Sequence, residues 1–342
     1  MSWLTDDEDD DEEYSEFDES SVKVRPNPKG SRPRTKTRPE HSDAVTGRVL
    51  AIDRGRYLVL LGEGTDDEHE LTAARARELG RNAIATGDRV DVVGDVSGAE
   101  GSLARIVRIQ ARTTLLRRSA DDTDEVERVI VANADQMLIV VAAANPEPRA
   151  RLVDRYLVAA FDAGVRPLLC LTKTDLADPE PFLKNFAGLG VTVFRRRADD
   201  PDVTELRREL EGVTTVAVGH SGVGKSTLVN ALVPSAHRAT GVVNVVTGRG
   251  RHTSSSTVSL RLPGGGWIID TPGIRSFGLG HVQPENLLRG FTDLAAVAED
   301  CPRGCTHLPD APDCELNEAA ARGDLNPDRV DSLQRLLITL AG

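Results

Sequence analysis

The stretch Gly219-His220-Ser221-Gly222-Val223-Gly224-Lys225-Ser226 decides the fold of this 342-residue chain. It matches the phosphate-loop pattern G-x-x-x-x-G-K-[ST] in the required context, because an apolar strand precedes it and a helical segment follows. Glycines let backbone N–H groups turn onto phosphate oxygens, the lysine lies between the β- and γ-phosphates, and the serine binds Mg²⁺. The residues predicted here to bind a nucleotide are Gly219, His220, Ser221, Gly222, Val223, Gly224, Lys225, Ser226 and Thr227.

A second motif, Asp270-Thr271-Pro272-Gly273, follows the apolar strand 267–269. An acid at the end of a buried strand can hold the Mg²⁺ shell, usually through water, and a glycine N–H can meet the γ-phosphate. The tetrapeptide alone would be weak evidence, but here it follows a phosphate loop. We therefore predict that Asp270 and Gly273 belong to the same nucleotide site.

The third motif, Thr172-Lys173-Thr174-Asp175, precedes the other two. It is a variant of [N/T]-K-x-D, in which the aspartate accepts both hydrogen bonds from the N1 and N2 edge of guanine and the lysine stem lies along the base. By composition alone a surface turn would be the commoner meaning, but the motif ends the buried strand 167–171. Because an ordinary GTPase carries this motif after the other two, the order predicts a circularly permuted domain that binds GTP or GDP with Mg²⁺.

Residues 117–295 alternate strands with helices, as the nucleotide domain requires. The apolar strand 136–142, the helical segment 149–163 and the apolar strand 167–171 form a βαβ series. Such a series predicts a parallel sheet with helices on both faces and with ligands beyond the carboxyl ends of its strands.

Two different segments precede this domain. Residues 1–43 form an acidic run and then a basic run with almost no apolar side chains, so we expect a disordered tail, whose basic half either only solubilises the chain or contacts RNA phosphates. Residues 44–116 contain about five short strands in about 70 residues, including 45–52, 56–61, 87–94 and 104–109, which predicts a small β-barrel of the OB-fold type. The barrel either binds oligonucleotides or only braces the next domain.

A cysteine-rich segment follows the nucleotide domain. Cys301, Cys305, His307 and Cys314 offer three thiolates and one imidazole, a closed tetrahedral set that suits one structural Zn²⁺. Buried cysteines without a metal are the less favoured alternative. We expect residues 296–342 to form a small α-helical zinc-binding domain with helices at 315–322 and 327–340, and Cys170 to be a core residue of its apolar strand.

Taken together, these motifs resemble those of the small-ribosomal-subunit biogenesis GTPase RsgA family, from about residue 44 to the end. The resemblance implies an OB-fold, a permuted GTPase domain and a zinc domain, and a GTP hydrolase that binds the maturing small (30S) ribosomal subunit and its 16S rRNA. It further implies that hydrolysis is coupled to late assembly and to release. Thr172 departs from the family, which often has asparagine there. No residue in 194–198 matches the family's guanine-backing loop.

The catalytic residue is also implied by the resemblance. Many GTPases orient the attacking water with a glutamine just after the Asp-x-x-Gly motif, but this chain has Ile274 there, which cannot hydrogen-bond water. By resemblance His252 is the candidate catalytic residue, and Thr253 is a candidate ligand of Mg²⁺ and the γ-phosphate. His252 could equally contact RNA phosphate or be a bystander.

Composition limits the remaining possibilities. No apolar run approaches the roughly 18 residues that cross a bilayer, and the acidic start is unlike a signal peptide, so we expect a cytoplasmic monomer that binds no membrane. The net charge of −12 does not exclude RNA, because binding depends on where positive charge clusters. Two rivals remain open: a GTP-regulated rRNA-binding scaffold with incidental hydrolysis, and a permuted GTPase acting on the large subunit. Asp175 argues against an ATPase.

Overall fold

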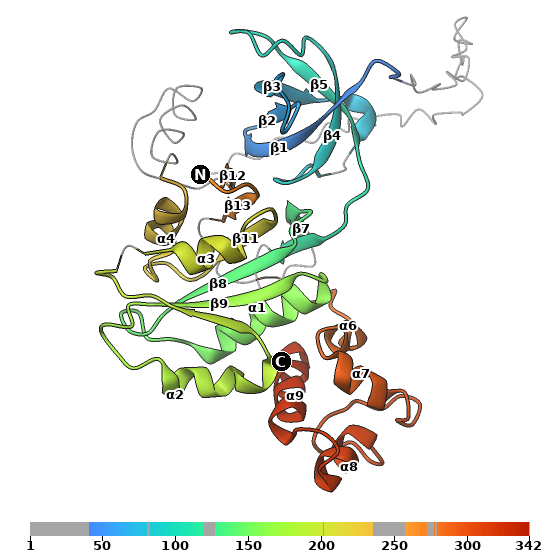
Figure 1. Ribbon diagram of the computed structural model, residues 1–342. Helices are drawn as coiled ribbons and strands as arrows, with labels where there is room; N and C mark the ends of the chain where they lie inside the picture. The colour runs from blue at the N-terminus through green and yellow to red at the C-terminus, as the bar shows by residue number, and fades with distance from the viewer. Residues whose placement is uncertain are drawn as a thin grey trace, which may run out of the picture. The chain divides into compact units, whose positions relative to one another are not determined.

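The computed structural model describes residues 41–341 except 81–82, 120–126, 201, 235–256, 272–276 and 278. Most of the segment predicted to be a disordered tail, residues 1–40, therefore lies outside the described residues. The fold of the remainder is that of a small barrel, an α/β domain and a helical C-terminal region, as the sequence predicts (Figure 1).

The first five strands close into a barrel. They are β1 (Val45–Asp53), β2 (Arg56–Leu61), β3 (His69–Arg75), β4 (Arg89–Gly94) and β5 (Ala104–Ile109), and the short 3-10 helix η2 (Arg77–Leu79) follows β3. The strand order is β1-β2-β3-β5-β4, and β4 pairs back onto β1. Alternate side chains of these strands, including Val49, Val59 and Ile106, fill the interior. The five-stranded, OB-like barrel is thereby confirmed.

A two-stranded hairpin connects the barrel to the next domain. It consists of β6 (Leu115–Ser119) and β7 (Glu127–Ala132), which pair antiparallel. The predicted domain boundary after residue 116 falls within β6. The predicted boundaries between domains stay predictions.

The nucleotide domain is built on a parallel sheet. Its strands are β8 (Gln136–Ala142), β9 (Arg166–Thr172), β10 (Thr192–Arg195), β11 (Thr214–Val218) and β13 (Trp267–Asp270), in the order β10-β9-β8-β11-β13, and β12 (Val258–Arg261) pairs antiparallel to β13. Every residue of β8 and β11 is buried, as expected of strands covered on both faces. β8 and β11 pair directly at the centre of the sheet, although β9, β10 and three α-helices lie between them in the sequence.

Helices cover this sheet, and a second helical group follows it. The first group is α1 (Ala150–Asp162), α2 (Glu180–Leu183), η3 (Lys184–Leu189), α3 (Thr204–Glu209) and α4 (Lys225–Leu232). The second is α6 (Pro284–Leu288), α7 (Thr292–Ala298), α8 (Glu315–Arg322) and α9 (Pro327–Ala341). None of the helices in the described part of the chain is both long and apolar enough to cross a membrane.

The last helix packs against the nucleotide domain and does not stand apart from it. α9 contacts α1 and η3, and Arg335 Nε lies 3.1 Å from Oδ1 of the buried Asp154. At Gly188 a Cβ atom would stand 2.2 Å from the carbonyl oxygen of Asp328, so only glycine permits this approach. Leu333 and Leu336 of α9 are fully buried in the core that contains α1.

Candidate functional site

The phosphate loop leaves the carboxyl end of the central strand β11 and enters α4, as the sequence predicts (Figure 1). Gly222 and Gly224 have φ values of 81° and 89°, in the region that favours glycine. A Cβ on Gly219 would stand 2.5 Å from the carbonyl oxygen of Val140 on β8. The loop can therefore run this close to the neighbouring strand only because its first residue is glycine.

The tetrapeptide 172–175 is hydrogen-bonded to the phosphate loop. Lys173 Nζ donates to the carbonyl oxygen of Gly222 at 2.9 Å and also to that of Asn145. The buried Thr172 hydroxyl donates to the carbonyl oxygen of Val223. These contacts place the guanine-type motif and the phosphate-type motif in one site, although the chain reaches them in inverted order.

Asp175 is exposed and faces the loop that follows β10. Its Oδ1 atom accepts a hydrogen bond from the backbone N–H of Ala198 at 2.8 Å, and Thr174 N–H donates to the carbonyl oxygen of Arg196 at 3.1 Å. Residues 196–198 thus back the motif, a role that the sequence could not assign. Because Arg196 and Ala198 contact the motif through backbone groups, their side chains give no sequence signal for this role. The available hint is that their loop follows β10, the strand that pairs with β9.

The Asp270 carboxylate meets the phosphate-loop lysine. Asp270 ends β13, next to β11 in the sheet, and its Oδ1 atom accepts from Lys225 Nζ, which is itself buried. Thr271, also fully buried, fixes the chain after β13 by donating to the carbonyl oxygen of Ala217 at 2.6 Å. Lys225, Ser226 and Asp270 are therefore grouped at the carboxyl ends of neighbouring parallel strands.

Five residues discussed from sequence lie outside the described residues: His252, Thr253, Pro272, Gly273 and Ile274. His220 of the phosphate loop is described, and its Nδ1 atom lies 2.9 Å from the carbonyl oxygen of Ser221. The remaining phosphate-loop residues lie where the pattern places them, and Thr227 is exposed on the first turn of α4.

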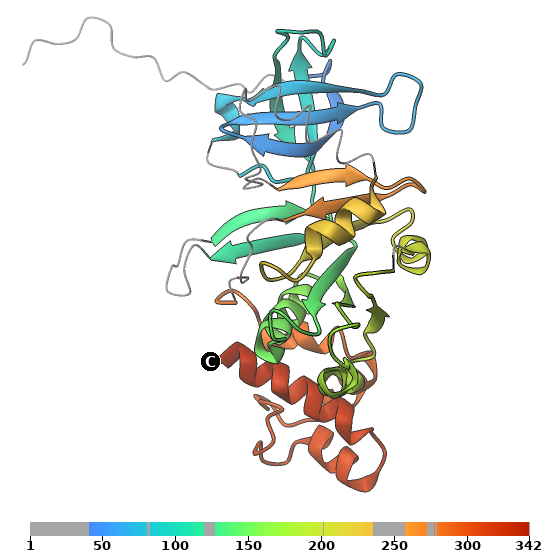
Figure 2. The ribbon, with the colours of Figure 1, turned by 90° about the vertical axis from the view of Figure 1, so that its left-hand side faces the viewer.

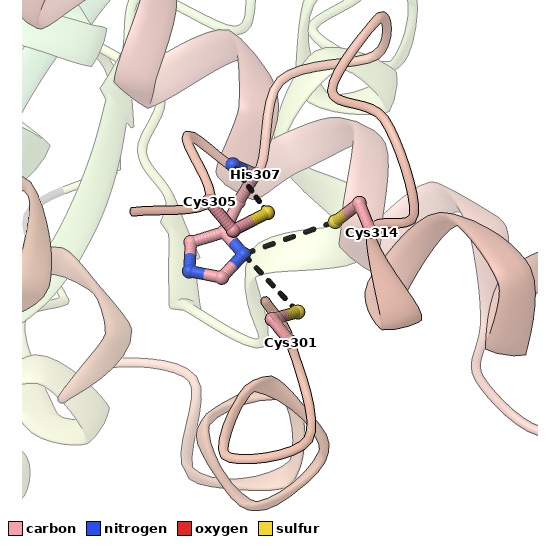
Figure 3. Close-up of side chains that lie close together, drawn as sticks. All are labelled: Cys301, Cys305, His307 and Cys314. Atoms are coloured by element: carbon pink, nitrogen blue, oxygen red, sulfur yellow. Dashed lines mark hydrogen bonds between the residues drawn. The ribbon is translucent and has the colours of Figure 1, made fainter. Parts of the chain in front are cut away.

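The predicted zinc ligands come together before α8. The ligand atoms of Cys301, Cys305, His307 and Cys314 all lie within 4.8 Å of one another (Figure 3). His307 Nδ1 is 3.6 Å from Cys301 Sγ and 3.8 Å from Cys314 Sγ. Two ligands of one tetrahedral Zn²⁺, with bonds of about 2.3 Å to sulfur and about 2.1 Å to nitrogen, would stand roughly 3.6 Å apart. The donor set and its spacing therefore fit zinc.

The protonation of the histidine agrees with this role. Burial lowers the pKa of His307, which favours the neutral imidazole that binds metals. Cys170, by contrast, is fully buried in β9, and burial raises the pKa of its thiol to about 12. It is a core residue, as expected.

Comparison with known proteins identifies a family. The sequence model described as RsgA GTPase matches residues 109–280. A protein of Pseudomonas aeruginosa named small ribosomal subunit biogenesis GTPase RsgA is 38% identical over 270 residues, which cover 75% of this chain and 76% of the relative. A relative with the same name from Chlorobaculum tepidum is 34% identical over 311 residues, covering 87% of this chain and 99% of the relative.

Two solved structures are similar in fold. YloQ, described as a circularly permuted GTPase, has a TM-score of 0.62 and 25% identity, and the match covers 88% of this chain and 96% of YloQ. YjeQ from Thermotoga maritima has a TM-score of 0.64 and 23% identity, and the match covers 87% of this chain and 99% of YjeQ.

Proposed function

The chain belongs to the RsgA family of GTPases, and on this premise we propose that it is a GTP hydrolase of small ribosomal subunit biogenesis. It binds the maturing 30S subunit and couples hydrolysis to late assembly and to its own release. The observation that carries the proposal is the bonding of Lys173 and Thr172 to the phosphate loop, which joins a guanine-reading motif to a phosphate-binding one. Cytoplasmic location, a monomeric state and the absence of membrane binding are part of the proposal.

The nucleotide is GTP or GDP with Mg²⁺. Asp175 and Lys173 read the guanine base, the backbone of 219–225 binds the phosphates, and Ser226 ligates the ion with Asp270 nearby. The ion supplies charge stabilisation at the β- and γ-phosphates. Lys225 would place its charge beside the β- and γ-phosphates, and in the structure its ammonium group donates to Asp270 at the same site. Gly273 and Thr253 complete the γ-phosphate contacts.

Hydrolysis needs a group that orients water. Because Ile274 stands where many GTPases have a glutamine, we propose His252 for this role. One structural Zn²⁺ held by Cys301, Cys305, His307 and Cys314 completes the set of cofactors.

The barrel offers a surface for 16S rRNA. Arg56 on β2 and Arg105 on β5 lie on either side of Ala74 in the register of the sheet. Five arginines at this end of the barrel are exposed, and no side-chain hydrogen bond or ion pair joins their guanidinium groups to any described residue: Arg54, Arg56, Arg75, Arg77 and Arg105. Such a cluster suits the phosphate backbone of RNA, whereas the paired arginines elsewhere are already neutralised.

Removing two of these arginines should weaken subunit binding in a salt-dependent way. For Arg56→Ala combined with Arg105→Ala, we expect the slope of log K against log salt to fall by about 1.4 to 1.8, because each phosphate contact contributes about 0.7 to 0.9. The measurement is 30S binding over a range of salt concentrations. Arg322→Ala is the control, since that exposed arginine is paired with Glu315 and Asp324. An unchanged slope in the double variant would place the RNA contact elsewhere.

GTP turnover measured alone and with each purified ribosomal subunit tests the function. We expect 30S subunits to raise turnover at least about tenfold, since groups supplied in trans to a GTPase can contribute about 10³- to 10⁵-fold. Large subunits should have no such effect, and His252→Ala should lose the stimulation while still binding GTP. Stimulation by 50S alone would favour the large-subunit rival. Nucleotide-independent 30S binding without stimulated turnover would favour the scaffold.

A further inference from the structure

Trp267, the first residue of β13, is enclosed by charged side chains of the barrel and of β12. Its indole N–H donates to Glu63 Oε1 at 2.6 Å, and the guanidinium carbons of Arg48 and Arg261 each lie 5.3 Å from the ring centroid. Glu63 belongs to the loop after β2, so a barrel carboxylate holds a side chain of the nucleotide domain. Trp267 is 6% exposed, which makes this contact a packed interface.

The charges around this ring are mutually paired. Glu63 Oε2 lies 3.2 Å from Arg48 Nε and 2.6 Å from Arg89 Nη1, and Arg48 Nη1 donates to the Thr214 hydroxyl at 3.4 Å. Burial raises the pKa of Glu63, but the hydrogen bond from Trp267 and the charges of the two arginines outweigh burial and lower it overall. The carboxylate is therefore ionised at neutral pH; it accepts hydrogen bonds from Trp267 and Arg48 and forms an ion pair with Arg89.

The barrel also contacts the β12–β13 hairpin at the end away from Trp267, where Val258 pairs with Asp270. Ala51 of β1 pairs with Val258, and the Thr86 hydroxyl donates to the carbonyl oxygen of Thr257 at 3.4 Å. Figure 2 shows this hairpin in orange beside the blue barrel strands. At the end of β12, Arg261 forms an ion pair with Glu68, which lies in the barrel loop between β2 and β3. The barrel thus contacts the start of β12 and the start of β13, the two ends of the hairpin.

β13 is only four residues long, and it carries Trp267 at one end and Asp270 at the other. At about 3.3 Å per residue these Cα atoms stand roughly 10 Å apart on one rigid segment. A displacement of Trp267 along the strand axis would be passed to Asp270, which faces Lys225. Whatever fixes the tryptophan therefore fixes the carboxylate.

We infer that Glu63 of the barrel is a positioning residue for Asp270, acting through Trp267, and that the barrel and the β12–β13 hairpin move as one body. The inference rests on the proposed GTPase function and adds to it that the nucleotide site depends on a domain that contributes no residue to it. RNA bound on the barrel and Mg²⁺ bound beside Asp270 would then be coupled through the β12–β13 hairpin.

The test compares three variants in GTP hydrolysis titrated with Mg²⁺. Glu63→Gln and Trp267→Phe should each raise the half-saturating Mg²⁺ concentration at least about fivefold, because displacing a site group by about 1 Å can cost on the order of 100-fold. Asp91→Asn is the matched control. Asp91 is a buried barrel carboxylate that accepts from Thr46, Gln110 and Arg108, and all of these partners lie in the barrel or directly after it. It should leave the Mg²⁺ titration unchanged.

A spectroscopic readout separates positioning from a general loss of stability. Trp3 and Trp267 are the only tryptophans, so Trp3→Phe leaves Trp267 as the single reporter. In that background, acrylamide quenching should be low and equal with GDP and with a non-hydrolysable GTP analogue, and Glu63→Gln should increase it. Thermal unfolding of each variant verifies that it is folded.

The two possible failures are distinguishable. If the wild-type protein shows no Mg²⁺-dependent GTP hydrolysis, the proposed function is wrong. If it hydrolyses GTP but Glu63→Gln and Trp267→Phe titrate like Asp91→Asn, the positioning role of Glu63 is wrong. Quenching that rises in the GTP state of the single-tryptophan protein would overturn movement as one body.

Discussion

Replacing Asp175 with asparagine should lower the affinity for GTP at least about 100-fold and transfer the preference to xanthosine triphosphate. The carboxylate accepts from N1 and N2 of guanine, and asparagine presents an N–H₂ donor in place of one acceptor. Sites that hydrogen-bond a polar group reject the mismatched analogue by about 10⁴ to 10⁵, because buried polar groups are left unpaired. Xanthine carries a carbonyl oxygen where guanine has its amino group, so the amide restores complementarity. Equilibrium binding of labelled GTP, XTP and ATP measures the change.

Asp178 supplies the matched control for this substitution. Asp175 and Asp178 are both exposed aspartates that accept one backbone hydrogen bond, Asp175 from Ala198 at 2.8 Å and Asp178 from Glu180 at 3.0 Å. Asp178→Asn should therefore change neither stability nor nucleotide preference appreciably. If Asp175→Asn kept its affinity for GTP, the tetrapeptide would be a surface turn, and the case for a permuted guanine site would lose its central residue.

The motifs of the nucleotide site could be predicted because each is a local pattern. A phosphate loop works through backbone N–H groups arranged by its own glycines, and the guanine motif works through consecutive side chains after a buried strand. Sequence alone was therefore enough to propose Lys173, Asp175 and Lys225 as members of one nucleotide site. It was also enough for the cysteine cluster, whose ligands fall within one short segment.

Contacts between distant backbone groups could not be predicted. Ala198 backs Asp175 with its N–H, and any residue except proline could provide that group. β3 was not assigned because the polar residues at its ends leave only Leu71 and Ala73 to show the alternation of buried side chains. Glu63 gave no signal either, since an isolated loop glutamate is ordinary until the fold brings Trp267 beside it.

The permuted order determines that the C-terminal helices follow the nucleotide domain directly after β13. Permutation lets the chain continue from the segment after Asp270 into the C-terminal helices, so that this segment joins the two domains directly. The structure adds a second attachment, because α9 returns to pack on α1 and η3. Tyr156 of α1 also holds Phe277 in an edge-on ring contact at 5.8 Å. Both ends of the C-terminal region are thereby fixed to the same face of the nucleotide domain.

Replacing Cys314, a proposed zinc ligand, with serine should unfold the segment around α8 and loosen α9. Cys314 is 1% exposed and directly precedes α8, so the ion would fix the start of that helix as well as the loop 301–307. Structural zinc contributes about 10 to 16 kcal/mol in small zinc-binding peptides, and a segment of this size has little other core to replace it. We expect loss of bound zinc and rapid protease cleavage between residues 300 and 325. Metal analysis and limited proteolysis followed by mass spectrometry measure both effects.

Cys170→Ala separates zinc binding from a general effect of losing a thiol. This substitution removes a fully buried sulfur from β9 and should lower overall stability by about 1 to 2 kcal/mol, but it should leave one zinc ion bound and the C-terminal segment resistant to protease. Chelation of the wild-type protein should reproduce the Cys314→Ser cleavage pattern, because both treatments remove the same ion. A protein purified with stoichiometric zinc after Cys314→Ser, or one whose 300–325 segment resists protease after complete chelation, would contradict a structural zinc site. The helices would then be held by their packing against one another and by the packing of α9 on α1 and η3.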